Sequence, residues 1–257
     1  MDFAIKINKI EDLKNLSKYK FIYFGNEFCE RKMPSFSFIK QIINFCNEHN
    51  KTPVLLTPYL TDEYLYKMKK LIEYVYSLRK KFEITIQDFG LIHFIKQFPE
   101  IKINLGRLQI KMKKGPEIMS KVLDENTETF KTNSLNNEFF IEFMKNEKIK
   151  RFEIDLPPQG ITLPASEKIT LYIGNSIITT TRRCPYIDSF NENYCQSLNK
   201  CKKECMNFYL IKNTKFYDEL IYVLGNAEFI KTSKKIPLEL KNKFDRILIF
   251  KKIEDLL

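Results

Sequence analysis

The residues from Phe21 to Thr57 read FIYFGNEFCERKMPSFSFIKQIINFCNEHNKTPVLLT, and they predict one strand–helix–strand unit. Phe21–Gly25 and Pro53–Thr57 are short runs of aromatic, β-branched and aliphatic residues, which are typical of strands. Apolar residues recur at helical spacing after Ser35, a residue type that caps helices. They are Phe38, Ile39, Ile42, Ile43 and Cys46. The stretch therefore predicts two strands joined by a helix with one apolar face.

The same alternation continues along the chain. Further runs predict strands at Phe3–Ile7, Glu83–Gln87, Ile101–Leu105, Arg151–Leu156, Ile169–Ile173 and Arg246–Phe250. A second amphipathic helix is predicted after Thr61, with Leu65, Met68, Leu71, Ile72 and Val75 on one face. Eight strands with helices between them, over about 250 residues, favour a parallel (β/α)8 TIM-like barrel over a doubly wound open sheet.

The C-terminal third departs from this alternation. The polar stretch of residues 182–207 contains cysteines and lacks strong periodicity, so we interpret it as an insertion. Phe208–Lys212 and Leu220–Lys231 predict the two strands of a β-hairpin. No internal repeat, low-complexity tract or linker marks a boundary. The sequence therefore predicts a single barrel domain over residues 1–257.

Composition and charge narrow the class of protein. The chain has 257 residues, 44% of them hydrophobic, with 22 Phe and 13 Tyr, which is enough for a packed core. Its formal net charge is +11, from 43 basic and 32 acidic residues. The longest uncharged stretch, Ile169 to Thr181, is too short and too polar to cross a bilayer. The N-terminus carries no apolar signal region, so we expect a cytoplasmic chain with reduced thiols.

Residue counts exclude glycine-rich nucleotide-binding loops and argue against histidine-based sites. The seven glycines are scattered, whereas dinucleotide and phosphate-binding loops need clustered glycines so that backbone amides can approach the ligand. His49 and His93 are the only histidines. They leave little for a histidine metal site or a nucleophile–base triad.

The cysteines carry the strongest chemical signal. There are six, namely Cys29, Cys46, Cys184, Cys195, Cys201 and Cys205, and the last four lie in or beside the insertion. Clustered thiols in a reducing compartment indicate metal ligands, because thiolate is a soft anionic donor. Cys29 follows a predicted strand, and loops after the carboxyl ends of barrel strands converge on one face. We therefore expect Cys29 to meet the late thiols, and Cys46 to be a core residue of its helix.

The spacing of these thiols favours an iron–sulfur cluster. Zinc is the alternative, but no Cys-x-x-Cys pair exists. Cys201-Lys-Lys-Glu-Cys205 begins like a radical-SAM motif, yet Phe208 stands where the third cysteine belongs. A 4Fe–4S cluster takes one cysteine per iron and accepts dispersed ligands. Nearby cations would offset its negative charge, namely Arg182, Arg183, Lys200, Lys202 and Lys203.

Several motifs together resemble a known family. They are Ile22-Tyr-Phe-Gly-Asn-Glu-Phe-Cys29-Glu-Arg31-Lys, Ile86-Gln-Asp88-Phe-Gly90-Leu, Leu105-Gly106-Arg107-Leu108, Arg183-Cys184 and Cys201-x3-Cys205. In this order they resemble peptidase family U32, the collagenase-like peptidases, and most of all its single-domain, UbiV-like iron–sulfur branch. The resemblance implies a β/α barrel and a 4Fe–4S cluster on Cys29, Cys184, Cys201 and Cys205. Cys195 is a further thiol that could replace either of the last two.

The resemblance leaves several functions open. The family includes peptidases, oxygen-independent hydroxylases of ubiquinone biosynthesis and proteins needed for hydroxylating RNA, and the UbiV-like branch acts with a paralogous partner. We expect first an iron–sulfur protein of anaerobic metabolism that supports such a hydroxylation. Arg31, Arg107 and Arg183 would then bind an anionic donor or substrate. Asp88 would act as an acid or base or orient an arginine.

Two alternatives come from other classes. The charge of +11 and the lysines from Lys111 to Lys114 favour an RNA-binding modification factor without catalysis of its own. A metal-dependent peptidase ranks last, because the sequence supplies no recognisable nucleophile with its base and no His-Glu metal motif.

Overall fold

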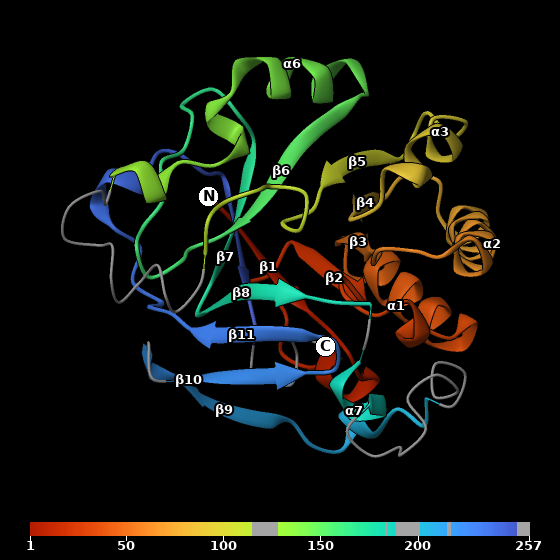
Figure 1. Cartoon of the computed structure of the whole chain (residues 1–257). Coiled ribbons are helices and arrows are strands. Elements are labelled where there is room, and N and C mark those ends of the chain that lie inside the picture. The colour runs from red at the N-terminus through yellow and green to blue at the C-terminus, as the bar shows by residue number, and fades with distance from the viewer. Residues whose placement is uncertain (115–127, 183, 189–200, 215–216, 251–257) are drawn as a thin grey trace.

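The chain forms a closed barrel with a second sheet beside it (Figure 1). The computed structural model describes residues 1–114, 128–182, 184–188, 201–214 and 217–250. The barrel strands are β1 (Asp2–Lys6), β2 (Phe21–Gly25), β3 (Thr52–Leu56), β4 (Glu83–Ile86), β5 (Lys102–Leu105), β6 (Ile149–Asp155), β7 (Ile169–Ile173) and β12 (Arg246–Ile249). Each is parallel to its neighbours, and β12 closes the barrel on β1. The predicted β/α barrel is confirmed, and every predicted barrel strand overlaps an observed one.

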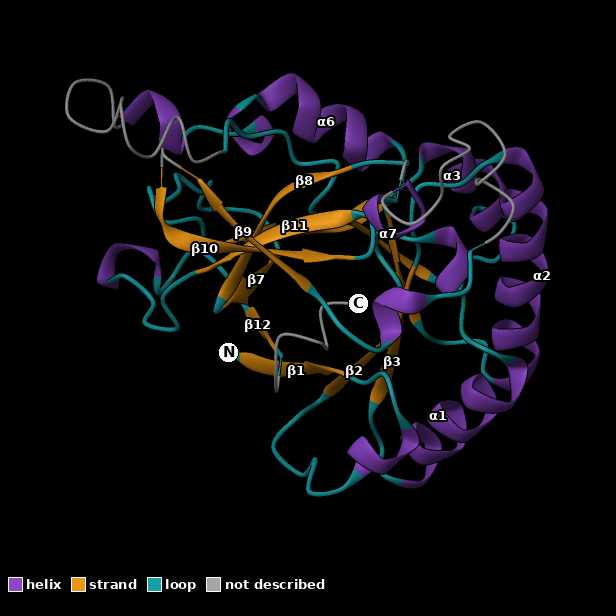
Figure 2. Cartoon of the chain, turned by 60° about the horizontal axis from the view of Figure 1, so that its bottom comes forward, coloured by secondary structure: helices purple, strands orange, loops and turns teal. Residues whose placement is uncertain are grey.

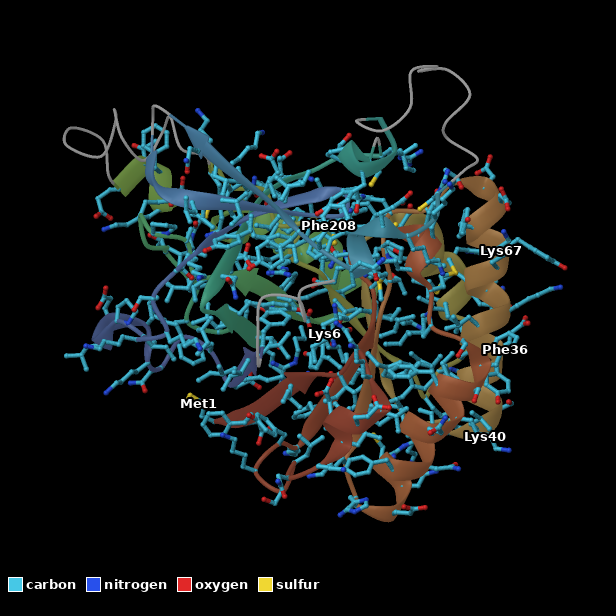
Figure 3. All side chains as sticks on the ribbon, turned by 90° about the horizontal axis from the view of Figure 1, so that it is seen from below. Met1, Lys6, Phe36, Lys40, Lys67 and Phe208 are labelled. Carbon is cyan, nitrogen blue, oxygen red and sulfur yellow. The ribbon has the colours of Figure 1, made fainter. Side chains whose placement is uncertain are left out.

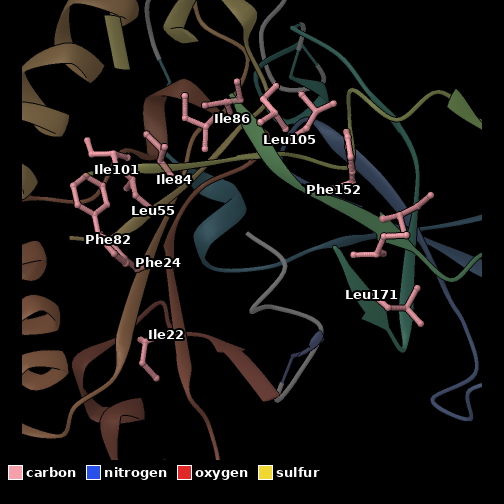
Figure 4. Close-up of a cluster of buried hydrophobic side chains, with 14 of the residues drawn as sticks. Ile22, Phe24, Leu55, Phe82, Ile84, Ile86, Ile101, Leu105, Phe152 and Leu171 are labelled. Atoms are coloured by element: carbon pink, nitrogen blue, oxygen red, sulfur yellow. The ribbon is translucent and has the colours of Figure 1, made fainter. Parts of the chain in front are cut away.

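Side-chain alternation along each strand explains why these residues form a barrel. On β2, Ile22 and Phe24 join the large cluster that includes the helices, whereas Phe21 and Tyr23 belong to a second cluster inside the barrel. On β3, Leu55 likewise joins the cluster that includes the helices. Figure 4 shows part of that cluster, with side chains from successive strands gathered together. Strands buried on both faces read as continuous apolar runs, which is the pattern found in the sequence.

Helices cover the outside of the barrel. They are α1 (Phe36–Glu48), α2 (Asp62–Leu78), α3 (Ile92–Ile95) and α6 (Glu138–Asn146). Figure 2 shows α1 and α2 along one flank. The Ser35 Oγ accepts from the Phe38 amide and caps α1, as predicted, but the Thr61 side chain makes no capping bond at α2. Among the described residues, no helix has both the length and the apolar character that a membrane span requires.

The second sheet differs from the predicted hairpin. It has four antiparallel strands in the order β8 (Asn175–Thr180), β11 (Ala227–Lys231), β10 (Tyr217–Leu224) and β9 (Leu210–Thr214). The predicted strand Leu220–Lys231 is wrong as one element, because the chain turns at Gly225, whose φ is +61°. β8 was not predicted as a separate strand, because its residues continue the uncharged run of β7. The two strands are separated by Gly174, where φ is +90°.

The second sheet packs against the interior of the barrel. Tyr222, Leu224 and Phe229 from this sheet share one buried cluster with barrel residues such as Tyr172 and Phe28. Phe28 belongs to the loop after β2, so the sheet lies on the loops that leave the carboxyl ends of the strands. This is the face on which β/α barrels assemble their sites.

Candidate functional site

Four cysteines line a single cavity of about 580 Å³. They are Cys29, Cys184, Cys201 and Cys205, the four cysteines singled out from the sequence, and none forms a disulfide. We call this space the cysteine cavity. Its walls also include Phe28, Tyr59, Ile187 and Asn226. The fold thus brings a thiol from the N-terminal quarter of the chain to three thiols from the last third.

The loop after β2 places Cys29 at the cavity. Gly25 ends the strand with a φ of +99°, and a Cβ there would lie 2.5 Å from the carbonyl oxygen of Leu56. Only glycine therefore fits this close turn without strain. The Asn26 Oδ1 then accepts from the amides of Phe28 and Cys29, at 2.9 and 2.7 Å. This side-chain turn fixes the Cys29 backbone at the cavity wall.

Asn226, in the turn between β10 and β11, links two cysteine-bearing loops. Its Nδ2 donates to the carbonyl oxygens of Phe28 and Thr181, at 2.7 Å each. Phe28 precedes Cys29, and Thr181 lies three residues before Cys184. One buried amide therefore sets the distance between the two loops.

Tyr186 anchors the segment that carries Cys184. It belongs to the short helix α7 (Pro185–Asp188), and its hydroxyl donates to the carbonyl oxygen of Val223 at 2.6 Å. The same hydroxyl accepts from the Leu210 amide at 3.1 Å. The Tyr186 ring packs in one apolar cluster with Cys184 and Cys205. These contacts hold two of the thiols against the second sheet.

The thiols influence one another's protonation. Burial raises the pKa of Cys29, and the neighbouring Cys205 and Cys201 raise it further. Burial also raises the pKa of Cys184 to about 11, with smaller contributions from Cys205 and Cys29. Both thiols are therefore protonated at neutral pH when nothing is bound. A metal would have to displace these protons, so its binding would release acid.

Cations line the cysteine cavity alongside the thiols. They are Arg31, Lys32, Arg182 and Lys203. Lys32 lowers the pKa of Cys29 and so partly opposes the effect of burial. The predicted substrate residue Arg183 lies outside the described residues, as do Cys195 and Lys200. The positive lining suits an anionic group such as a thiolate-bound cluster.

The cavity cysteines can be compared with the ligand sets that a single metal ion and a cluster require. Over the described ranges, no three His, Cys, Asp or Glu side chains converge closely enough to hold one ion. Zinc needs four ligands within about 2.3 Å of one point. A 4Fe–4S cluster instead takes one thiolate at each of four irons, so its ligands stand around a space. Four free thiols line the cysteine cavity, which is the number of ligands that a cluster needs, and the cluster itself stays a prediction.

Comparison with solved structures covers almost the whole chain. The U32 peptidase Mk0906 superposes with a TM-score of 0.51, over 98% of this chain and 93% of that one, at 10% sequence identity. The two proteins share the β/α-barrel fold. A glycoside hydrolase family 18 N-acetylglucosaminidase from Paenibacillus barengoltzii aligns over 99% of this chain and 95% of its own, at 7% identity. Its TM-score of 0.36 is too low to establish a shared fold. No family model and no curated protein matches the chain.

Asp88 is not among the described residues that line the cysteine cavity, but it supports the loop that carries the lining residues Tyr59 and Thr61. Its Oδ2 accepts from the Leu60 amide and its Oδ1 from the Gly90 amide, at 2.9 and 2.8 Å. Both oxygens therefore brace neighbouring loops. The substrate role predicted for Asp88 stays a prediction, and it would require one of these backbone bonds to be exchanged.

Arg107 is buried inside the barrel. Its guanidinium pairs with Glu27 at 2.9 Å and with Asp155 at 2.6 Å, and none of the three side chains is exposed. The guanidinium carbon also lies 4.3 Å from the ring centre of Tyr172. These contacts give Arg107 a structural role at the carboxyl end of the barrel, and binding of substrate by this residue stays a prediction.

The partners of Arg107 were missed from the sequence. Burial alone would raise the pKa of Asp155, but Lys114 and Arg107 lower it below the ordinary range. The Gln87 side chain donates to Glu27 and accepts from the Leu108 amide. Gly106 leaves room for this side chain, because a Cβ at Gly106 would lie 2.0 Å from the Gln87 Nε2. The available signal was the alternation of carboxylates with apolar residues in β6, where Glu153 and Asp155 follow Phe152 and Ile154.

Neither histidine of the chain lines the cysteine cavity. His49 follows α1, and His93 lies on α3; both are exposed. Neither is among the described residues that line the cysteine cavity. No cysteine–histidine pair of a peptidase is therefore formed there.

Proposed function

We propose that this chain is an iron–sulfur protein that holds a 4Fe–4S cluster on Cys29, Cys184, Cys201 and Cys205 and supports an oxygen-independent hydroxylation. One observation carries the proposal, namely that four free thiols from three separate segments line one cavity. The hydroxylation, with a quinone precursor or RNA as the substrate, comes from the resemblance to the UbiV-like branch of the family.

The chain's own residues have distinct tasks in this proposal. The four thiolates hold the cluster, and Lys32, Arg182 and Lys203 offset its charge. A bound cluster would supply one-electron chemistry at potentials set by charge, hydrogen bonding and solvent exposure. Arg31 lines the same cavity and is the predicted substrate residue best placed for an anionic donor. Arg183 is proposed for the same task through its position next to Cys184.

RNA binding is a second candidate, favoured by the net charge of +11. The basic run that suggested it is partly engaged inside the protein. Lys111 donates to the carbonyl oxygen of Leu108, and Lys114 pairs with Asp155 at 2.7 Å. A steep loss of RNA affinity with added salt would support this candidate, whereas no binding near physiological salt would eliminate it.

Peptidase activity has the least support. At 10% identity, the U32 peptidase establishes a shared fold and no shared chemistry. A paralogous partner, implied by the resemblance, would appear as a complex of two different chains on co-purification.

The proposal is tested by purifying the full chain without oxygen. We expect a broad visible absorption band together with about four iron and four sulfide per chain. Zinc in place of iron would overturn the cluster and redirect the proposal to a structural metal. Neither metal, in protein purified and reconstituted without oxygen, would remove the proposed role.

A further inference from the structure

A second cavity, of about 630 Å³, adjoins the cysteine cavity. The two cavities share Lys32 and Cys205 as lining residues. The second cavity lies between the ends of β1 and β2, the beginning of α1 and the segment around Cys205 that leads to β9. We call it the apolar cavity, since its lining side chains include Ile7, Pro34, Phe38, Met206, Phe208, Tyr209 and Leu224.

The size and lining of the apolar cavity suit a small organic molecule. Ligand sites are typically hollows of roughly 300–1,000 Å³ with mostly apolar walls and few polar groups. Met206 and Phe208 line this cavity and are 61% and 44% exposed, so they add apolar surface that a ligand could contact. Figure 3 labels Phe208, which lines the apolar cavity, and Phe36, where α1 begins.

Lys32 supplies the polar contact that such a ligand needs. Its Nζ is buried and has no hydrogen-bond partner among the described residues. Burial of an unpaired ammonium is costly, because no protein group replaces the water that it gives up. The group is retained at the boundary of two cavities, where a bound anion would pair with it.

The other charges of the apolar cavity limit the charge of that anion. The charged residues among its described lining are Lys9, Asp12 and Lys32, which sum to a net charge of +1. A single negative charge balances this lining, whereas a dianion would meet repulsion from Asp12. A carboxylate on an apolar body satisfies both the walls and the charge.

We infer that the apolar cavity binds a small organic monocarboxylate, with its carboxylate on the Lys32 Nζ and its apolar body against Phe38 and Leu224. The inference goes beyond the proposed cluster and does not require it. The shared residues Lys32 and Cys205 place this ligand beside the cysteine cavity, so it would lie next to whatever those thiols hold.

Calorimetric titration of the full chain tests the inference with two probes of the same shape. The probes are 2-naphthoate and its uncharged counterpart 2-naphthamide. We expect wild type to bind naphthoate, and Lys32→Met to weaken that binding by about tenfold or more with little change for naphthamide. Lys40→Met is the matched control, because Lys40 lies on the exposed face of α1 (Figure 3). It should bind both probes like wild type.

Two results would overturn the inference. One is equal affinity of wild type and Lys32→Met for naphthoate; the other is no binding of naphthoate to wild type at millimolar concentrations. Thermal unfolding without ligand adds a second readout. In protein that holds neither a cluster nor a ligand, Lys32→Met should melt at or above the wild-type temperature, because it removes a buried unpaired charge, and a clear fall would mean that Lys32 has a partner within the protein. Iron is assayed in the same samples, so that a failure to bind naphthoate can be told apart from a failure to hold the proposed cluster.

Discussion

Asn226 donates from its Nδ2 to the carbonyl oxygen of Phe28, which lies 198 residues earlier, at a distance of 2.7 Å. The same nitrogen donates to Thr181 at 2.7 Å. The two acceptors belong to the loops that carry Cys29 and Cys184. The turn of the second sheet therefore controls the relative position of two thiols that the barrel alone would leave independent.

Replacing Asn226 by alanine should loosen both loops. The change leaves the buried carbonyl oxygen of Phe28 and the partly buried one of Thr181 without this donor, so we expect the free energy of unfolding to fall by roughly 1–3 kcal/mol. Iron retained per chain should fall as well. Denaturant unfolding and an iron assay measure the two effects, with Asn213→Ala on the exposed part of β9 as the control. Unchanged iron in Asn226→Ala would show that this amide does not position the thiols.

The barrel could be predicted because its signal is local. Phe21–Gly25 and Ile169–Ile173 were predicted with the observed bounds, since strands buried on both faces are continuous apolar runs. The second sheet was harder. Its β8 follows β7 after a single glycine, Gly174, so the sequence shows one uninterrupted run. In the structure the chain leaves the barrel at Gly174, where φ is +90°.

The meeting of Cys29 with the late thiols could be predicted from the sequence, whereas the residues that support them could not, and the role of the thiols as ligands stays a prediction. Unusual clustering and a position after a strand identified Cys29 and the late thiols. No sequence pattern distinguishes Asn226 and Tyr186, because asparagines in turns and buried tyrosines are common. Their importance comes from pairings across many residues, such as Tyr186 with Val223, which only the folded chain reveals.

Tyr186→Phe tests the support of Cys184. The variant keeps the ring in its apolar cluster but removes the bonds to Val223 and Leu210. We expect a loss of about 1–2 kcal/mol in the free energy of unfolding. The amount of cluster that survives a chelator challenge should also decrease. Tyr66→Phe, at an exposed site on α2, is the control and should behave like wild type in both assays.

Glu153 should make stability depend on pH near neutrality. Burial raises its pKa from an ordinary value near 4.5 to about 7, despite hydrogen bonds donated by Tyr172 and Tyr23. Between these two values the folded state keeps a proton that the unfolded state loses. The stabilisation that the protonated Glu153 gives the folded state is therefore fully present below about pH 4. It is lost as the pH rises through 7, by a total on the order of 3 kcal/mol.

Glu153→Gln isolates this contribution, because glutamine cannot titrate. Free energies of unfolding of wild type and variant are compared from pH 4 to pH 8, a range of about four units that spans both pKa values. We expect the difference between the two proteins to shift in favour of the variant as the pH rises. A constant difference across this range would contradict the raised pKa.

Arg107→Met should be among the most destabilising substitutions in the barrel. It leaves the buried carboxylate of Glu27 without its cation, which costs about 3–5 kcal/mol. Asp155 keeps Lys114 as a partner. Adding Glu27→Gln to Arg107→Met should therefore restore part of the loss. Additive losses in the double variant, measured by denaturant unfolding, would argue against the buried pair.

The central claim is that Cys29 and the late thiols hold one cluster, and iron content in single cysteine variants tests it most directly. Cys46 is the internal control, since it is a fully buried core residue of α1 whose pKa is raised by burial to about 12. After anaerobic purification, wild type and Cys46→Ala should each contain about four iron and four sulfide per chain. Cys29→Ala and Cys184→Ala should lose the cluster. Equal iron in all three variants would contradict the claim.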